Sequence, residues 1–163
     1  MTIEIKAKIE DLEKVENSIK NIGAQFVSEV EATDIYFNSK EKTNLKIGIY
    51  PEGHLPKTGN FLLFFEHDPV SKKFQFKQME IDDVETLRYI LDKVLGTKIV
   101  IKSKRKFYKL DNVIILIVFI SKLGYYLCLQ GENEKEIHEI FDKLGIKETC
   151  IETKSFDMLM LEK

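Results

Sequence analysis

Residues 113–132 read VIILIVFISKLGYYLCLQGE, and this predicted hairpin decides the fold. Val113 to Ile120 are eight apolar residues in a row, six of them β-branched. A strand with one face in water alternates apolar and polar residues, because successive side chains point to opposite faces. This strand does not alternate, so we expect both of its faces to be covered.

One unit occurs three times in the chain, at residues 3–24, 77–98 and 126–147. Each copy begins as an alternating strand, passes an acidic or asparagine turn and continues as an amphipathic helix. The candidate N-caps, whose short polar side chains accept amide protons of the first helical turn, are Asp11, Asp83 and Asn133. The glycines near the helix ends, where a positive φ is favoured, are Gly23, Gly96 and Gly145.

Each predicted helix carries one apolar face, which we expect to pack on the sheet. The faces consist of Leu12, Val15, Ile19 and Ile22, of Leu87, Ile90, Leu91 and Val94, and of Ile137, Ile140, Phe141 and Leu144.

Four further segments predict strands, at residues 31–38, 44–50, 60–67 and 72–81. Residues 51–59, PEGHLPKTG, hold two prolines and two glycines and predict a loop. No linker or low-complexity stretch divides the chain, so we expect residues 1–163 to form a single domain. About eight strands and three helices predict an α+β fold, in which a mostly antiparallel sheet closes toward a barrel with helices packed outside.

The composition excludes several classes of protein. A formal net charge of −2 offers no general basic field for nucleic acid. Eight consecutive apolar residues fall far short of the roughly 20 that span a bilayer, and the charged start MTIEIK is not a signal peptide, so we expect a cytoplasmic protein without a membrane partner. Cys128 and Cys150 lack metal-ligand spacing, and Cys128 is interpreted as a small core residue.

Seven segments carry a resemblance to a known family, in the order in which the family has them. They are the charged strand at residues 2–9, the helix that ends in Ile-Gly, DIYF (34–37), LKIGIY (45–50), LLFFEHDP (62–69), IVIKSKRKFYKL (99–110) with the hairpin 120–132, and SFDMLML (155–161). The chain resembles the CYTH superfamily over essentially its whole length. That superfamily includes class IV adenylyl cyclases, thiamine triphosphatases and inorganic triphosphatases.

The resemblance implies a tunnel of antiparallel strands that holds a triphosphate. One wall of basic residues would grip phosphate oxygens, and carboxylates would hold divalent metal ions. The family's charged positions are only partly kept here. Its Glu-x-Glu-x-Lys falls on Thr2, Glu4 and Lys6, its Arg-x-Arg on Lys46 and Gly48, its lysine before a proline on Glu66, and its later carboxylates on Val118, Cys128, Gln130 and Met158.

We therefore expect the fold without metal-dependent catalysis, and a small anionic ligand, polyphosphate- or nucleotide-like, in the tunnel. No cofactor is expected. The apolar or neutral residues Ile114, Leu116, Val118, Cys128 and Gln130 should face the tunnel, and Glu66 should pair with Lys46. By strand parity and the resemblance, the predicted ligand-binding residues are Glu4, Lys6, Lys8, Lys46, Lys102, Lys104 and Arg105.

Two alternatives stay open. An active triphosphatase or adenylyl cyclase would need Mg²⁺ held by Glu4 with further carboxylates, such as Glu80 or Asp157. An apolar-ligand or interaction protein would use an interior of Ile114, Leu116, Val118, Phe64, Phe76 and Met158, or a homodimer built on the outer face of residues 113–119. Beside both stands a plain packing hypothesis, in which helices cover the outside of the barrel and side chains fill its inside.

Overall fold

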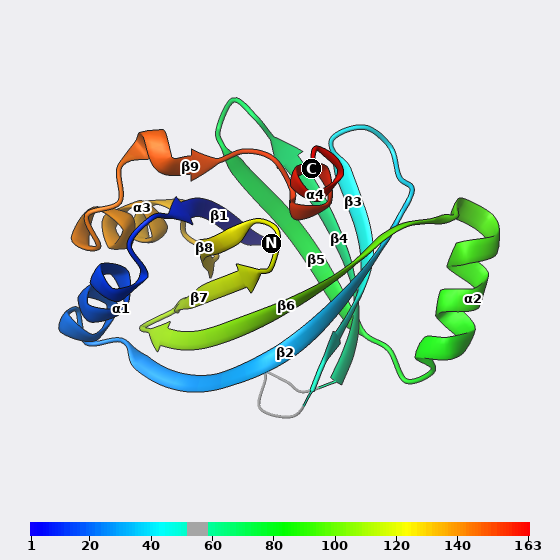
Figure 1. The fold of residues 1–163 in the computed structure, drawn as a ribbon, viewed down its shortest axis with the longest axis horizontal. Coiled ribbons are helices and arrows are strands. Elements are labelled where there is room, and N and C mark those ends of the chain that lie inside the picture. Colours follow the sequence, from blue (N-terminus) through cyan, green and yellow to red (C-terminus); the bar gives the residue numbers. More distant parts are fainter. Residues whose placement is uncertain (52–58) are drawn as a thin grey trace.

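The computed structural model describes residues 1–51 and 59–163. Within these residues, eight strands form one closed antiparallel barrel, a short ninth strand adds to its edge, and helices pack outside it (Figure 1). The strands are β1 Thr2–Ile9, β2 Gln25–Phe37, β3 Thr43–Tyr50, β4 Gly59–Asp68, β5 Lys73–Glu80, β6 Thr97–Leu110, β7 Val113–Ile120, β8 Gly124–Gly131 and β9 Ile151–Glu152. The helices are α1 Leu12–Asn21, α2 Val84–Leu95, α3 Glu134–Lys143 and α4 Phe156–Leu161, with a 3₁₀ turn at Glu148–Cys150. The predicted fold class is confirmed.

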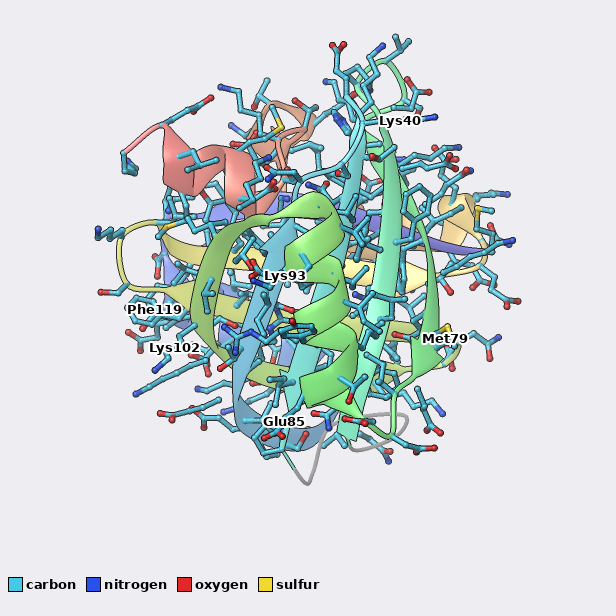
Figure 2. The ribbon with its side chains drawn as sticks, turned by 90° about the vertical axis from the view of Figure 1, so that its right-hand side faces the viewer. Lys40, Met79, Glu85, Lys93, Lys102 and Phe119 are labelled. Atoms are coloured by element: carbon cyan, nitrogen blue, oxygen red, sulfur yellow. The ribbon has the colours of Figure 1, made fainter. Side chains whose placement is uncertain are left out.

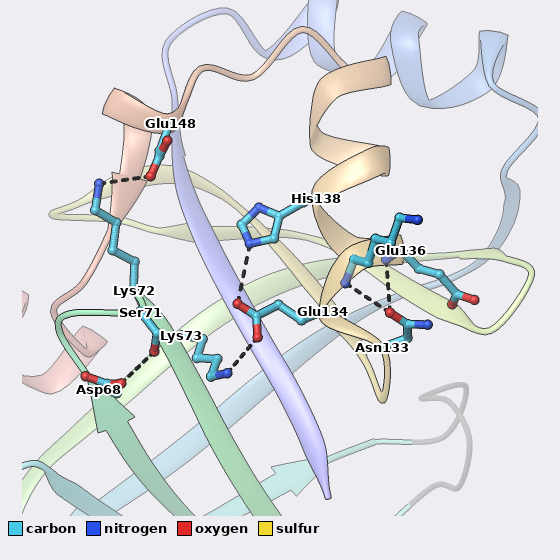
Figure 3. Close-up of polar contacts among 10 residues, drawn as sticks. Asp68, Ser71, Lys72, Lys73, Asn133, Glu134, Glu136, His138 and Glu148 are labelled. Atoms are coloured by element: carbon cyan, nitrogen blue, oxygen red, sulfur yellow. Dashed lines mark hydrogen bonds and ion pairs between the residues drawn. The ribbon is translucent and has the colours of Figure 1, made fainter.

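The barrel closes through β1. Its strand order is β5-β4-β3-β2-β6-β7-β8-β1, and β1 also pairs with β5. This closing ladder is short, running from the Thr2–Phe76 pair to the Glu4–Phe74 pair, after which β9 takes over as the neighbour of β1. Two ion pairs reinforce the seam from outside: Lys73 binds Glu134 of α3 at 2.6 Å, and Lys72 binds Glu148 at 3.5 Å (Figure 3).

The outer face of the long apolar strand is covered by the chain's own helices. Val113, Ile115 and Ile117 are at most 3% exposed and belong to one core with α1 and α3. The helix faces predicted around Val15 and Ile140 supply the other side of this core. The expectation that both faces of this strand are covered is confirmed.

The predicted helix ends are confirmed as well. The side chains of Asp11, Asp83 and Asn133 each accept a backbone N–H of the first helical turn; the Asn133 contacts are drawn in Figure 3. Gly96 caps α2 with a φ of 82°, and glycines with positive φ follow the caps of α1 and α3.

Helix α2 covers a different part of the barrel. Leu87 and Leu91 pack on a small core made by Ile35, Phe37 and Ile47 of β2 and β3. The prediction was wrong for the other two members of that helix face, because Ile90 and Val94 are 48% and 72% exposed. Figure 2 shows α2 in front of the barrel, as an outer layer.

Most of the predicted loop at residues 51–59, including His54, lies outside the described residues. Among the described helices, none is both long and apolar enough to cross a membrane.

Candidate functional site

The inside of the barrel is lined by every second residue of each strand. On β7 and β8 the predicted inward residues Leu116, Val118 and Cys128 are at most 2% exposed, and Ile114 and Gln130 line the same interior. The parity predicted for this hairpin is confirmed. Burial raises the pKa of the Cys128 thiol well above its ordinary value, which agrees with an unreactive core residue.

Two neighbouring chambers occupy this interior. The inner one is small, about 50 Å³, and Lys6, Phe74, Ser155 and Phe156 belong to its wall. The outer one is about 530 Å³ and reaches Asn133 at the start of α3. Their common wall is formed by Tyr50, Leu63, Arg105, Leu116 and Gln130.

Beside the inner chamber lies a buried ionic cluster of Asp34, Lys46, Tyr50 and Arg105, here called the Asp34 cluster. Three adjacent strands supply it: β2 carries Asp34, β3 carries Lys46 and Tyr50, and β6 carries Arg105. The Asp34 carboxylate accepts the Tyr50 hydroxyl at 3.1 Å and contacts Lys46 Nζ at 3.2 Å and Arg105 Nη2 at 2.5 Å. Arg105 Nε also donates to Ser103 Oγ at 3.0 Å.

The charges of this cluster hold one another ionised. Burial alone would raise the pKa of Asp34, but the charges of Arg105 and Lys46 outweigh it and lower that pKa. Burial would lower the pKa of Lys46 and Arg105, and the Asp34 carboxylate reverses this and raises both. All three groups therefore stay charged inside the barrel across the physiological pH range.

Lys6 is the third buried cation of the tunnel, beside Lys46 and Arg105. Its side chain is 2% exposed, and its ammonium lies 4.6 Å from the ring centre of Phe74 and 4.3 Å from that of Phe156. Among the described residues it forms no ion pair or hydrogen bond. Burial lowers its pKa below that of an ordinary lysine. An ammonium held between aromatic faces in a polar chamber is suited to receive an anion.

Glu4 and Lys8 flank Lys6 on β1. Glu4 lines the inner chamber and accepts a 2.6 Å hydrogen bond from Gln130 Nε2, its register partner on β8. Lys8 faces the same side of the strand but lies beyond the chambers, where it donates to the Leu123 carbonyl and lies over the Tyr126 ring. The structure thus brings together Glu4, Lys6, Lys46 and Arg105, and leaves Lys8 apart.

Lys102 and Lys104 are outside the barrel, so the inward parity predicted for them was wrong. On β6 the inner positions are Ile101, Ser103 and Arg105, which are buried, whereas both lysines are exposed. Their register partners, Thr33 and Glu31, lie on the uncovered outer surface of β2, where water solvates charged side chains at little cost. Figure 2 shows Lys102 at the edge of the molecule.

Glu66 does not pair with Lys46, which also contradicts the prediction. Glu66 is exposed and lies opposite Thr43, whereas Lys46 points inward to Asp34. Phe64, on the same outer face as Glu66, is 39% exposed, while Phe76 does line the outer chamber. The inward positions of β4 are instead Leu63 and Phe65.

The end of the barrel near α4 holds the carboxylate of Asp157. It is 1% exposed, accepts Asn44 Nδ2 at 3.0 Å and pairs with Lys98 Nζ at 2.7 Å. The neighbouring Met158, predicted to face inward, is 37% exposed because α4 turns it to the surface. Glu80 is exposed at the end of β5. Within residues 1–51 and 59–163, no three His, Cys, Asp or Glu side chains converge as metal ligands.

Sequence reasoning missed Asp34, Tyr50 and Ser155 as parts of the site. A signal existed for Asp34: on β2 the inward residues Val30, Ala32, Asp34 and Tyr36 include a single charge, and a charge on an otherwise buried face needs a partner.

Comparisons with known proteins agree on the fold. No family model matches the chain. A Methanocaldococcus jannaschii protein that carries the provisional name adenylate cyclase is 32% identical, over 94% of this chain and 95% of its own. A structure from Pyrococcus horikoshii has a TM-score of 0.84 at 24% identity and covers 98% of this chain and 99% of its own. A Hippeastrum protein, described as an adenylyl cyclase candidate with a dominant triphosphatase activity, has a TM-score of 0.61 at 12% identity, covering 99% of this chain and 96% of its own.

Proposed function

The chain belongs to the CYTH superfamily of adenylyl cyclases and triphosphatases, and we propose that it binds a small anionic ligand in its tunnel without metal-dependent catalysis. The observation that carries this proposal is Lys6, a buried ammonium that makes no direct ion pair or hydrogen bond among the described residues and faces a chamber inside the barrel. Burying such a charge costs desolvation free energy, and an anion that pairs with it would offset this cost.

The carboxylates of the tunnel support a site that works without Mg²⁺. Mg²⁺ prefers several oxygen ligands in octahedral geometry. Here Asp34 is saturated by Lys46, Tyr50 and Arg105, and Glu4 accepts the amide of Gln130. The residues present therefore do not fit a divalent metal site of the family's type, and we derive no catalytic step through one.

Calorimetric titration with inorganic phosphate and tripolyphosphate, each with and without Mg²⁺, tests the proposal. We expect binding that does not need Mg²⁺ and that weakens as salt is added, because salt screens charge pairs. Lys6→Met should weaken binding by about 10- to 100-fold, since a hydrogen bond to a charged group contributes about 1.5–3 kcal/mol.

Lys102→Met is the matched control, because it removes the same charge from the outer face of β6. It should leave binding unchanged. Equal losses for the two variants, or no binding by the wild-type protein, would contradict the proposal.

A second candidate function is metal-dependent hydrolysis or cyclisation of a nucleoside or organic triphosphate. The names of the Methanocaldococcus and Hippeastrum proteins favour it. Assays with ATP, thiamine triphosphate and tripolyphosphate in Mg²⁺ or Mn²⁺ decide between the two. Metal-dependent turnover that is lost in Glu4→Gln and kept in Lys102→Met would establish the enzyme and overturn the binding proposal.

A further inference from the structure

The Asp34 cluster has the donor arrangement of an anion site. A lysine ammonium, an arginine guanidinium and a tyrosine hydroxyl converge from three adjacent strands on one pair of oxygens. Lys46 and Arg105 are the kind of residues that grip phosphate or carboxylate oxygens of a ligand. Here the two oxygens belong to the chain itself, at Asp34.

Asp34 cannot easily leave this position. It is 1% exposed, and its strand β2 is paired on both sides, with β3 and β6. A ligand that displaced its carboxylate would leave a buried charge without a partner, which costs about 3–5 kcal/mol. Lys46 and Arg105 are therefore already neutralised with respect to an incoming ligand.

The inner chamber offers two groups that lack partners. Besides the Lys6 ammonium, Ser155 Oγ is buried and forms no hydrogen bond among the described residues, and both side chains line the chamber. A buried hydroxyl without a partner is costly, so its presence beside an unpaired ammonium indicates a group that both would bind. The chamber's small volume fits one such group.

The charges around the inner chamber also favour a ligand with a single anionic group. Around the inner chamber, the three cations Lys6, Lys46 and Arg105 face the two carboxylates Glu4 and Asp34, which leaves one positive charge there. Among the described residues, the outer chamber adds no cation of its own and is lined by the carboxylates Glu132 and Glu136. We infer that the tunnel takes a ligand with a single anionic group, carboxylate- or monophosphate-sized, held by Lys6 and Ser155, because Asp34 already neutralises Lys46 and Arg105, the cations that would bind a second group. This inference rests on the proposed function and names its ligand class.

Titration of the full chain with acetate, inorganic phosphate and tripolyphosphate without Mg²⁺ tests it. In the wild-type protein, tripolyphosphate should bind within about threefold of inorganic phosphate, because its further phosphates find no free cation. Tighter binding of acetate than of phosphate would assign the head group to a carboxylate, and the reverse to a phosphate. A wild-type preference for tripolyphosphate of tenfold or more would overturn the inference.

The variant Asp34→Asn provides a second test of the inference. It frees Lys46 and Arg105, so tripolyphosphate should bind at least tenfold more tightly than to the wild-type protein. Because this variant is expected to lose stability, its melting temperature is also measured with acetate. A rise in melting temperature well beyond that of the wild-type protein would show the added anion replacing the lost carboxylate.

The two experiments distinguish a failure of this inference from a failure of the proposed function. If the wild-type protein binds no anion, the proposed function fails, and a gain of binding or of acetate stabilisation in Asp34→Asn still supports the assignment of Asp34. If Asp34→Asn gains neither, the inference is overturned even where the wild-type protein binds phosphate through Lys6.

Discussion

The ring of Tyr50 fills the space in which a side chain at Gly48 would lie. A Cβ placed on Gly48 would fall 2.5 Å from both Cζ and Oη of Tyr50, a distance that real Cβ atoms essentially never show. The ring that fills this space also donates its hydroxyl to Asp34, so Gly48 leaves room for a side chain that belongs to the Asp34 cluster.

Gly48→Ala is expected to destabilise the fold by about 1–3 kcal/mol, the usual range for overpacking. The Tyr50 ring cannot easily move, because it contacts Phe61, Arg105 and Asp34. Urea unfolding of Gly48→Ala, Tyr50→Ala and the double variant measures the coupling. We expect the alanine at 48 to cost much less when Tyr50 is absent. Purely additive effects would show that the two positions do not compete for space.

Lys6→Met should stabilise the protein at neutral pH by about 1–2 kcal/mol, because an apolar side chain of similar size avoids the cost of burying an ammonium. Function and stability are thus opposed at this residue, as is common at binding sites. Chemical unfolding at pH 7 measures the gain. A loss of stability would mean that the contacts of the ammonium with Phe74 and Phe156 exceed its burial cost.

The pH dependence at Lys6 has a definite sign. Its folded pKa is lowered by burial, so between that pKa and the unfolded value near 10.5 the unfolded chain binds more protons. The contribution of Lys6 therefore becomes more favourable as pH rises through this interval. The advantage of Lys6→Met over wild type should shrink from pH 7 toward pH 10.5. An advantage that stays constant over this interval would contradict the lowered pKa.

Asp34→Asn should cost about 3–5 kcal/mol at pH 7, because Lys46 and Arg105 lose their buried counter-ion. The folded pKa of Asp34 is lowered, so its stabilising contribution is present above the unfolded pKa of about 3.9 and is lost as pH falls through the folded value. The stability gap between wild type and variant should therefore narrow below about pH 4. Asp142→Asn, at an exposed position on α3, is the control, and its stability should stay close to that of the wild-type protein over the same pH range.

Asp157→Asn should loosen α4 from the end of the barrel. The variant keeps the shape of the side chain but weakens its pairing with Lys98 and its two contacts with Asn44, at a cost of about 1–3 kcal/mol. Limited proteolysis should then remove the C-terminal segment faster than in wild type. Glu162→Gln, which affects only the exposed pair with Lys154, is the control and should be cleaved at the wild-type rate.

Local patterns were sufficient to predict much of this protein. The strands β1, β3 and β8, the apolar run of β7 and the caps at Asp11, Asp83 and Asn133 each depend on residues close together in the chain, and each was confirmed. The prediction of which β6 residues face inward was wrong because every second residue of IKSKRKF forms two different sets. One set contains the lysines, and the other contains Ser103 and Arg105. Only the uncovered outer surface beside β2 decides which of them faces water.

The sequence by itself determined which residues can be buried together, because hydrophobic periodicity and capping are local properties. The tertiary structure alone decided which charges meet. Asp34 and Arg105 are 71 positions apart, and their pairing follows from the registers of β2 with β3 and β6. Lys6 makes no direct ion pair because the inward carboxylates of Glu4 and Asp34 are engaged by other residues. Electrostatic partners depend on distances across the closed barrel, and those distances exist only once the barrel has formed.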